Sequence, residues 1–183
     1  METESVPVDG PTYLGTTPPV SYSVPLPDDL NMNNELIAYM ERSNVFETRD
    51  GQIARDGAIT ILLEFVKEWV VSVGMRKNIS PENLVDGAGV QLKVYGSQRL
   101  GVHSPTADID VLCLTPSFVT RDDYFTSFCE LLKSAAQVSS TFPTLAESSM
   151  SSSGIDISMV SPIPDAYTPV IKFCLNGIPI DMI

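Results

Sequence analysis

The dipeptide Asn176-Gly177 is the feature that most restricts how this chain can fold, because it separates two apolar runs, residues 170–175 and 178–183. An Asn-Gly pair adopts left-handed backbone angles at low cost, which favours a two-residue turn between antiparallel strands. Pro179 is compatible with the first residues of a strand or with an edge strand. The sequence therefore predicts a β-hairpin that carries Asp181 on its second strand.

Alternation of apolar and polar side chains predicts two more strands, at residues 90–95 and 107–114. The strongest helical periodicity covers residues 56–73, where apolar side chains recur at steps of three and four. Trp69 belongs to this stripe and is predicted to lie in the core, and Gly74 is suited to end the helix. We therefore expect an α/β (α+β) fold in which helices pack on a mixed sheet.

Two shorter helices are also predicted. Apolar residues share one face of residues 33–40. Thr120 and Asp123 resemble a capping arrangement before a second amphipathic segment at residues 124–132.

The composition changes at two places along the chain. Residues 1–28 hold many of the prolines and predict an extended or disordered N-terminal arm. Residues 134–165 are rich in serine and predict a flexible surface loop or insertion. Residues 29–183 would then form one domain that contains this insertion.

The charge and the cysteines limit the possible functions. The chain carries 23 acidic and 11 basic residues, a net charge of −12, whereas proteins that grip nucleic acid by themselves are usually basic. The sequence contains no run of five or more Lys and Arg of the kind that indicates nuclear import. No apolar run reaches the roughly 18–20 residues of a membrane span. The three cysteines suggest neither a zinc site nor a disulfide framework. We expect a soluble intracellular protein without a membrane partner.

Three acidic residues and a Gly-Ser pair form a pattern suited to phosphate chemistry. Asp108 and Asp110 alternate along one predicted strand, so their carboxylates share a face and can bridge two Mg²⁺ ions. Asp181 would supply a third carboxylate, and a two-metal site of this kind supports phosphoryl or nucleotidyl transfer. Gly96 allows the backbone to approach a phosphate closely, and Ser97 offers a hydroxyl and an N–H at a helix start.

Other polar residues have competing interpretations. Asp156 is a rival third ligand, because its neighbours also alternate. His103, the single histidine, is better explained by a structural role, since two-metal transfer needs no imidazole. Lys93 and Lys172 are expected to be solvated strand residues, and Arg99 either positions its loop or forms a surface ion pair.

Residues 95–110, Tyr-Gly-Ser-Gln-Arg-Leu-Gly-Val-His-Ser-Pro-Thr-Ala-Asp-Ile-Asp, closely resemble the signature of eukaryotic nuclear poly(A) polymerases, members of the polymerase-β-like nucleotidyltransferase superfamily. Arg-Leu-Gly-Val-His distinguishes this family from noncanonical tailing enzymes, which share only the Gly-Ser and the Asp-x-Asp. The resemblance extends to residues 124–128, 169–173 and 177–181, and to residues 13–19 in the arm. It implies a polymerase-β-like fold.

The resemblance also implies a site and a reaction. Asp108, Asp110 and Asp181 would bind Mg²⁺, with Mn²⁺ as an alternative, and Asp181 would help to activate the RNA 3′-hydroxyl. The ATP site would consist of these aspartates together with Tyr95, Gly96, Ser97, Ser104 and Ile109. The family usually has Phe at the position of Tyr95 and Thr at that of Ser104. The enzyme would transfer AMP from ATP to the RNA 3′ end in the nucleus, alongside the cleavage and polyadenylation machinery.

The chain departs from the family in two respects. It ends two residues after Asp181, where the family continues into a helical domain and a basic RNA-binding domain, so we expect a fold truncated at its C-terminal end and little polyadenylation by this polypeptide alone. The 71 residues from Asp110 to Asp181 also exceed the usual gap, and the Ser-rich segment accounts for the excess. The alternatives are a non-catalytic nucleotide-binding or regulatory short form, and a related nucleotidyltransferase with another nucleotide or acceptor.

Overall fold

A computed structural model describes residue 17 and residues 23–141 and 155–183. The chain forms two compact units, Met1–Tyr39 and Met40–Ile183. Most of helix α1 (Pro27–Arg42) lies in the first unit, and it contains the helix predicted at residues 33–40. Asp29 caps its start by accepting a hydrogen bond of 2.8 Å from the backbone N–H of Leu26. Most of the predicted arm lies outside the described residues.

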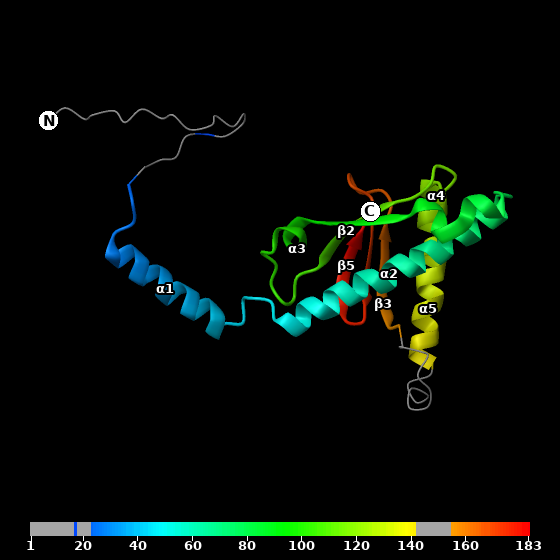
Figure 1. Cartoon of the computed structure of the whole chain (residues 1–183). Coiled ribbons are helices and arrows are strands. Elements are labelled where there is room, and N and C mark those ends of the chain that lie inside the picture. The colour runs from blue at the N-terminus through cyan, green and yellow to red at the C-terminus, as the bar shows by residue number, and fades with distance from the viewer. Residues whose placement is uncertain (1–16, 18–22, 142–154) are drawn as a thin grey trace. The chain divides into compact units, whose positions relative to one another are not determined.

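The second unit is built on a five-stranded sheet with the order β1-β2-β5-β4-β3 (Figure 1). Its strands are β1 (Gln91–Tyr95), β2 (Ile109–Leu114), β3 (Ile157–Ile163), β4 (Val170–Leu175) and β5 (Ile178–Met182). Strand β2 pairs with β5 in parallel, and the other neighbouring strands pair antiparallel. The predicted mixed sheet is therefore confirmed.

The predicted hairpin is also confirmed, as β4 and β5. Asn176 and Gly177 have φ angles of 52° and 78°, so both residues adopt the left-handed conformation that a tight hairpin turn needs. This turn fixes the register of β5 against β4 and thereby the position of Asp181.

Helix α2 (Arg49–Arg76) is the longest element and packs on the sheet (Figure 1). Thr48 caps its start through a 2.9 Å hydrogen bond from Gly51 N–H, and Trp69 is 2% exposed, as predicted. Gly74 does not end the helix, contrary to the prediction. A Cβ on Gly74 would lie 2.4 Å from a methyl group of Leu84, so glycine is needed there for close packing.

Short helices complete the second unit. They are the 3₁₀ helix η1 (Pro81–Gly89), α3 (Gly96–Leu100), α4 (Arg121–Asp123), the π-helix η2 (Tyr124–Phe128) and α5 (Cys129–Thr141). The predicted capping box is confirmed at α4, where Thr120 and Asp123 bond each other's backbone N–H groups. Helices α2 and α5 bury one face of the sheet in a core with Ile109, Val111 and Ile180.

The Ser-rich segment differs from the loop predicted for residues 134–165. Helix α5 continues to Thr141, and β3 forms the outer strand beside β4, so the prediction is wrong at both ends of the segment. A register shift between Ser158 and Ser161 interrupts the pairing, and Met159 has a φ of 54°, which breaks the alternation that identifies a strand. Residues 142–154 lie outside the described residues.

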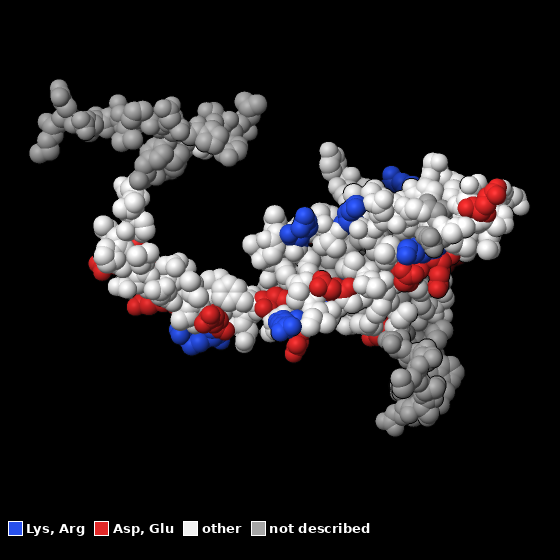
Figure 2. Space-filling model, in the orientation of Figure 1, with Lys and Arg blue, Asp and Glu red and all other residues white. Residues whose placement is uncertain are grey.

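Charged side chains are dispersed on the surface that Figure 2 presents. Lys and Arg appear as separate groups on this face and do not gather into one continuous basic patch. Within the described part of the chain, no helix combines the length and the apolar character needed to cross a bilayer.

Candidate active site

Four polar side chains form a row across the sheet. Tyr95 of β1 lies opposite Asp110 of β2, Asp110 is the register partner of Asp181 on β5, and Asp181 lies opposite Lys172 on β4. Because register partners in a sheet share a face, all four project to the same side. The pairing of strands thus joins residues that are up to 86 positions apart in the sequence.

Apolar residues between these polar ones force the row onto the face opposite the helices. Ile109, Val111 and Ile180 are completely buried in the core, and strand alternation then turns Asp110 and Asp181 the other way. Asp108 immediately precedes β2, two residues before Asp110, and is half-buried. The structure therefore gathers all three predicted aspartates at one place on this face.

Gly96 lies directly against the Asp110 carboxylate. A Cβ built on Gly96 would be 2.0 Å from Asp110 Oδ2, and the residue has a φ of +63°. Glycine is thus required both by the space and by the left-handed backbone. The chain turns here from β1 into α3, so the first backbone groups of that helix lie next to the carboxylates.

The electrostatics of the row reflect crowded negative charge. Burial raises the pKa of Asp110, and the neighbouring charges of Asp108 and Asp181 raise it further, while Lys172 opposes the shift. Burial and the same three carboxylates raise the pKa of Tyr95. These shifts are the expected result of burial and of gathering like charges, and the gathered negative charge favours a bound cation.

Lys172 Nζ bonds Asp181 Oδ2, although the sequence suggested a solvated lysine. That hydrogen bond raises the pKa of Lys172 and keeps it charged. Its side chain is 47% exposed, so only part of the lysine contacts the site. The signal that could have revealed this pairing is the hairpin register, which places Lys172 four residues before Asn176 and Asp181 four residues after Gly177.

The donor chemistry of the row fits divalent cations. Carboxylate oxygens are the ligands that Mg²⁺ and Mn²⁺ prefer, and the mutual repulsion that raises the pKa of Asp110 would be relieved by a cation. In the described residues, no three Asp, Glu, His or Cys side chains enclose a single ion position.

The other predicted site residues lie around this row. Ser97 is half-buried in the first turn of α3, and Ser104 lies in the loop that leads to Asp108. The side chain of Ile109 points into the core, which leaves only its backbone near the carboxylates. Ser97, Ser104 and Ile109 stay predictions as nucleotide contacts.

Asp156 lies away from the row. It precedes β3, two strands from β5, and its backbone exchanges hydrogen bonds with Asn176 at the hairpin turn. This position argues against Asp156 as the third ligand. The His103 side chain is 5% exposed, and its Nε2 lies 3.8 Å from Glu47 Oε2, while neither ring nitrogen has a hydrogen-bond partner in the described structure. The structural role of His103 stays a prediction.

Sequence reasoning missed two residues that contact the loop before Asp108. Arg55 of α2 is 3% exposed and donates to backbone carbonyls of this loop, and Glu47 accepts a hydrogen bond from Arg55. The helical periodicity offered one signal, since Arg55 falls three residues before Ala58 on the buried face of α2.

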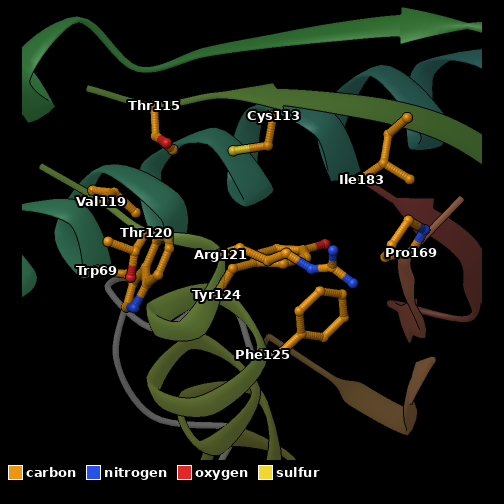
Figure 3. A pocket seen from close by; sticks show the side chains of 10 residues that line it. All are labelled: Trp69, Cys113, Thr115, Val119, Thr120, Arg121, Tyr124, Phe125, Pro169 and Ile183. Carbon is orange, nitrogen blue, oxygen red and sulfur yellow. The ribbon is translucent and has the colours of Figure 1, made fainter. Parts of the chain in front are cut away.

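A separate cavity of about 310 Å³ lies on the helix side of the sheet (Figure 3). Trp69, Cys113 and Tyr124 line it, and the Arg121 guanidinium lies 5.6 Å from the centre of the Phe125 ring. Burial raises the pKa of the Cys113 thiol to about 12, which disfavours the thiolate form. The cavity is on the opposite face from the aspartates, and we assign it no function.

Residues 15–147 match the family model of the poly(A) polymerase nucleotidyltransferase domain. The match covers most of the chain, which therefore belongs to the poly(A) polymerase nucleotidyltransferase family. The nucleotidyltransferase fold inferred from the signature is confirmed by this match.

Curated relatives agree with the family match. The chain is 32% identical over 178 residues to nuclear poly(A) polymerase 4 of Arabidopsis thaliana, covering 97% of this chain and 21% of that protein. It is 33% identical to poly(A) polymerase PAPa of Candida albicans, with 92% and 27% covered. It is 32% identical to the poly(A) polymerase of Dictyostelium discoideum, with 96% and 19% covered. The chain thus spans about a fifth to a quarter of the length of these relatives.

Among solved structures, a chain of the GLD-2/RNP-8 complex is similar with a TM-score of 0.44 and 14% sequence identity. The similarity covers 83% of this chain and 37% of that one.

Proposed function

We propose that this chain is the catalytic part of an enzyme that transfers AMP from ATP to the 3′-hydroxyl of RNA. The observation that carries the proposal is the register of Asp110 and Asp181 on parallel neighbouring strands, with Asp108 two residues before Asp110 and Gly96 against its carboxylate. Family membership supports the reaction class, and the relatives named as poly(A) polymerases support ATP and RNA as substrates.

In the proposed reaction, the RNA 3′-oxygen forms a bond to the α-phosphorus of ATP, the bond from that phosphorus to the β-phosphate oxygen breaks, and pyrophosphate leaves. Asp108, Asp110 and Asp181 would hold Mg²⁺ or Mn²⁺, which would neutralise the phosphates and acidify the attacking hydroxyl. Asp181 would orient this hydroxyl and favour transfer of its proton to solvent water. The backbone of Gly96 and the Ser97 hydroxyl would contact the triphosphate at the start of α3.

Lys172 has a role in the proposal as well. It bonds Asp181 in the structure, so it would hold that carboxylate in place until the nucleotide and its cations bind. Its positive charge also lowers the pKa of Asp110, which favours the ionised form that binds a cation.

The wider context is proposed from the relatives alone. The chain is acidic overall, with a net charge of −12, so we infer that most of the RNA affinity resides outside these residues. A nuclear location is supported by the Arabidopsis relative, which is named as nuclear. Association with the cleavage and polyadenylation machinery rests on the family resemblance. We also propose that residues 1–183 alone extend RNA weakly, with ATP binding as their measurable activity.

The test is Mg²⁺-dependent ATP binding by the purified chain, measured by isothermal titration calorimetry. We expect Asp110→Asn and Asp108→Ala to weaken this binding at least about tenfold. Asp156→Asn is the matched control, because Asp156 is an acidic residue beside the same sheet but away from the row, and it should bind ATP like the wild type.

Two results would contradict the proposal. If the wild-type chain binds ATP equally well with and without Mg²⁺, the aspartates are not a cation site. If Asp110→Asn leaves Mg²⁺-dependent binding unchanged, the nucleotide binds elsewhere. Retained partner binding without nucleotide affinity would favour the regulatory alternative.

A further inference from the structure

Among the described residues, Arg55 is the one charged residue that is buried. It lies on α2 and is 3% exposed, although nearly all other buried side chains around it are apolar. Burying a guanidinium is costly unless its donors are satisfied by close acceptors. The acceptors that Arg55 contacts should therefore reveal why the cation is there.

The acceptors belong to the loop that ends at Asp108. Arg55 Nη2 donates to the backbone carbonyls of Ala107 at 2.8 Å, Pro105 at 2.9 Å and Ser104 at 3.3 Å. Ala107 is the residue directly before Asp108. A single guanidinium nitrogen of Arg55 thus donates to three backbone carbonyls of residues 104–107, the loop that leads into β2.

This loop has little apolar packing to hold it. Pro105 and Thr106 are exposed, and Ser104 and Ala107 are only half-buried. Within the loop, the backbone hydrogen bond from Ala107 N–H to Ser104 O has a length of 3.1 Å. The position of the loop therefore depends mainly on its polar contacts with Arg55.

Glu47 fixes Arg55 from the other side. Its Oε2 accepts from Arg55 Nε at 2.7 Å, and its Oε1 accepts from Thr48 N–H at 2.8 Å, just before the start of α2. The Glu47 side chain is 11% exposed, so this ion pair is shielded from solvent. Burial alone would raise the pKa of Glu47, but the hydrogen bonds from Arg55 and Thr48 hold it below its usual value. The guanidinium consequently has a defined orientation towards the loop.

We propose that Arg55, oriented by Glu47, is a positioning residue that sets the place of Asp108 relative to Asp110 and Asp181. The carboxylates of Asp110 and Asp181 are held by the strand register, whereas Asp108 lies before β2 begins and depends on the loop. The catalytic consequence rests on the proposed function, in which Asp108 binds a cation beside ATP. The structural part, that Arg55 holds residues 104–108 in place, does not.

The experiment compares Arg55→Met with Arg76→Met in the full 183-residue chain. Arg76 is an exposed arginine at the other end of the same helix, so the control removes the same cation from α2 without touching the loop. Hydrogen–deuterium exchange reports the loop directly, and calorimetry reports Mg²⁺-dependent ATP binding. For Arg55→Met we expect faster exchange confined to peptides covering residues 104–108 and at least about tenfold weaker Mg²⁺-dependent ATP binding. Arg76→Met should match the wild type in both measurements.

Two conservative variants separate positioning from simple loss of stability. Arg55→Lys keeps the charge and can reach some of the carbonyls but loses the bond to Glu47, so exchange and affinity should lie between those of wild type and Arg55→Met. Glu47→Gln keeps an oxygen for Arg55 Nε and should have a smaller effect than Arg55→Met. If Arg55→Met does not fold, these two variants carry the test.

The inference about Arg55 and the proposed function can be contradicted independently. Wild-type exchange of residues 104–108 in folded Arg55→Met, or in both conservative variants, would overturn the inference. So would weakened ATP binding that Arg76→Met reproduces. If the wild-type chain shows no Mg²⁺-dependent ATP binding, the proposed function fails for this polypeptide, and the exchange data still decide whether Arg55 holds the loop.

Discussion

Gly96 and Asp110 are so close that a single methyl group on Gly96 would lie 2.0 Å from Asp110 Oδ2. The contact joins the turn after β1 to the middle of the acidic row. In our proposal, the backbone that contacts the triphosphate therefore passes directly beside a carboxylate, where only glycine fits.

Gly96→Ala should therefore displace Asp110 and weaken Mg²⁺-dependent ATP binding by at least about tenfold. The control is Gly101→Ala. Gly101 has a similar φ of +70° but no atom within 4 Å of an added Cβ, so it experiences the backbone strain without the collision. Both variants should lose about 1 kcal/mol of unfolding free energy from that strain, measured by urea denaturation. Equal ATP affinity in the two variants would show that the contact with Asp110 is unimportant.

Replacing Lys172 by Met should make ATP binding more sensitive to acid. Lys172 lowers the pKa of Asp110, so removing it raises that pKa, and the carboxylate becomes protonated at a higher pH. Since a cation binds the ionised form, Mg²⁺-dependent ATP affinity is lost as pH falls through this pKa. The loss should begin at a higher pH in Lys172→Met than in the wild type. The measurement is the ratio of Mg²⁺-dependent ATP affinities at pH 8 and pH 5.5.

Lys93→Met is the matched control for this prediction. Lys93 lies on the same face of the sheet, opposite Leu112, and is exposed. The affinity ratio of this variant should equal that of the wild type. A ratio in Lys172→Met that is also unchanged would mean that the Lys172 charge does not influence Asp110.

The Asp123 cap should stabilise the fold in a pH-dependent way. The hydrogen bond from Lys77, followed by those from Thr120, lowers the pKa of Asp123 from 3.8 to about 2. A lowered pKa contributes stability above the unfolded value, and this contribution is lost as pH falls from about 4 towards 2. We expect Asp123→Asn to reduce the unfolding free energy by about 1 kcal/mol at pH 7 and by clearly less at pH 3.

Urea denaturation at the two pH values tests this prediction, with Asp122→Asn as the control. Asp122 is an exposed neighbour in the same first turn and should show little effect at either pH. A destabilisation of Asp123→Asn that is as large at pH 3 as at pH 7 would contradict the assigned role of the carboxylate charge.

The parts of the fold that follow from local sequence were predictable. The Asn176-Gly177 turn needs only two adjacent residues with left-handed angles, and the buried stripe that includes Trp69 follows from helical periodicity. Alternation along residues 107–114 was enough to predict that Asp108 and Asp110 share one face, although Asp108 lies just before β2. The hairpin then brought Asp181 into the same group, although the parallel pairing with β2 needed the structure.

The parts that depend on tertiary contacts were not predictable. Strand β3 was missed because its surroundings are rich in serine, a composition typical of loops, and its pairing with β4 shifts register between Ser158 and Ser161. Arg55 appeared to be one polar residue in a long helix, since its partners lie about 50 positions away at residues 104–107. Gly74 looked like a helix end, but its missing side chain allows Leu84 to pack closely against α2.

The last prediction concerns the bond between Tyr124 and β5. Tyr124 of the π-helix η2 donates its hydroxyl to the backbone carbonyl of Met182 at 2.6 Å, and burial raises the pKa of this tyrosine, so it stays a donor at every physiological pH. Tyr124→Phe leaves the Met182 carbonyl without this partner and should lower the unfolding free energy by about 1–2 kcal/mol. Because the β4–β5 and β2–β5 ladders also hold Asp181, Mg²⁺-dependent ATP affinity should change by no more than about threefold.

Tyr167→Phe is the control for this substitution, because Tyr167 is fully exposed and precedes β4 in the sequence. It should unfold at the same urea concentration as the wild type. If Tyr124→Phe is as stable as Tyr167→Phe, the hydroxyl does not hold β5. If instead its ATP affinity falls as far as that of Asp110→Asn, then the end of β5 is held by Tyr124 rather than by the strand ladders, and the position of Asp181 depends on the helix.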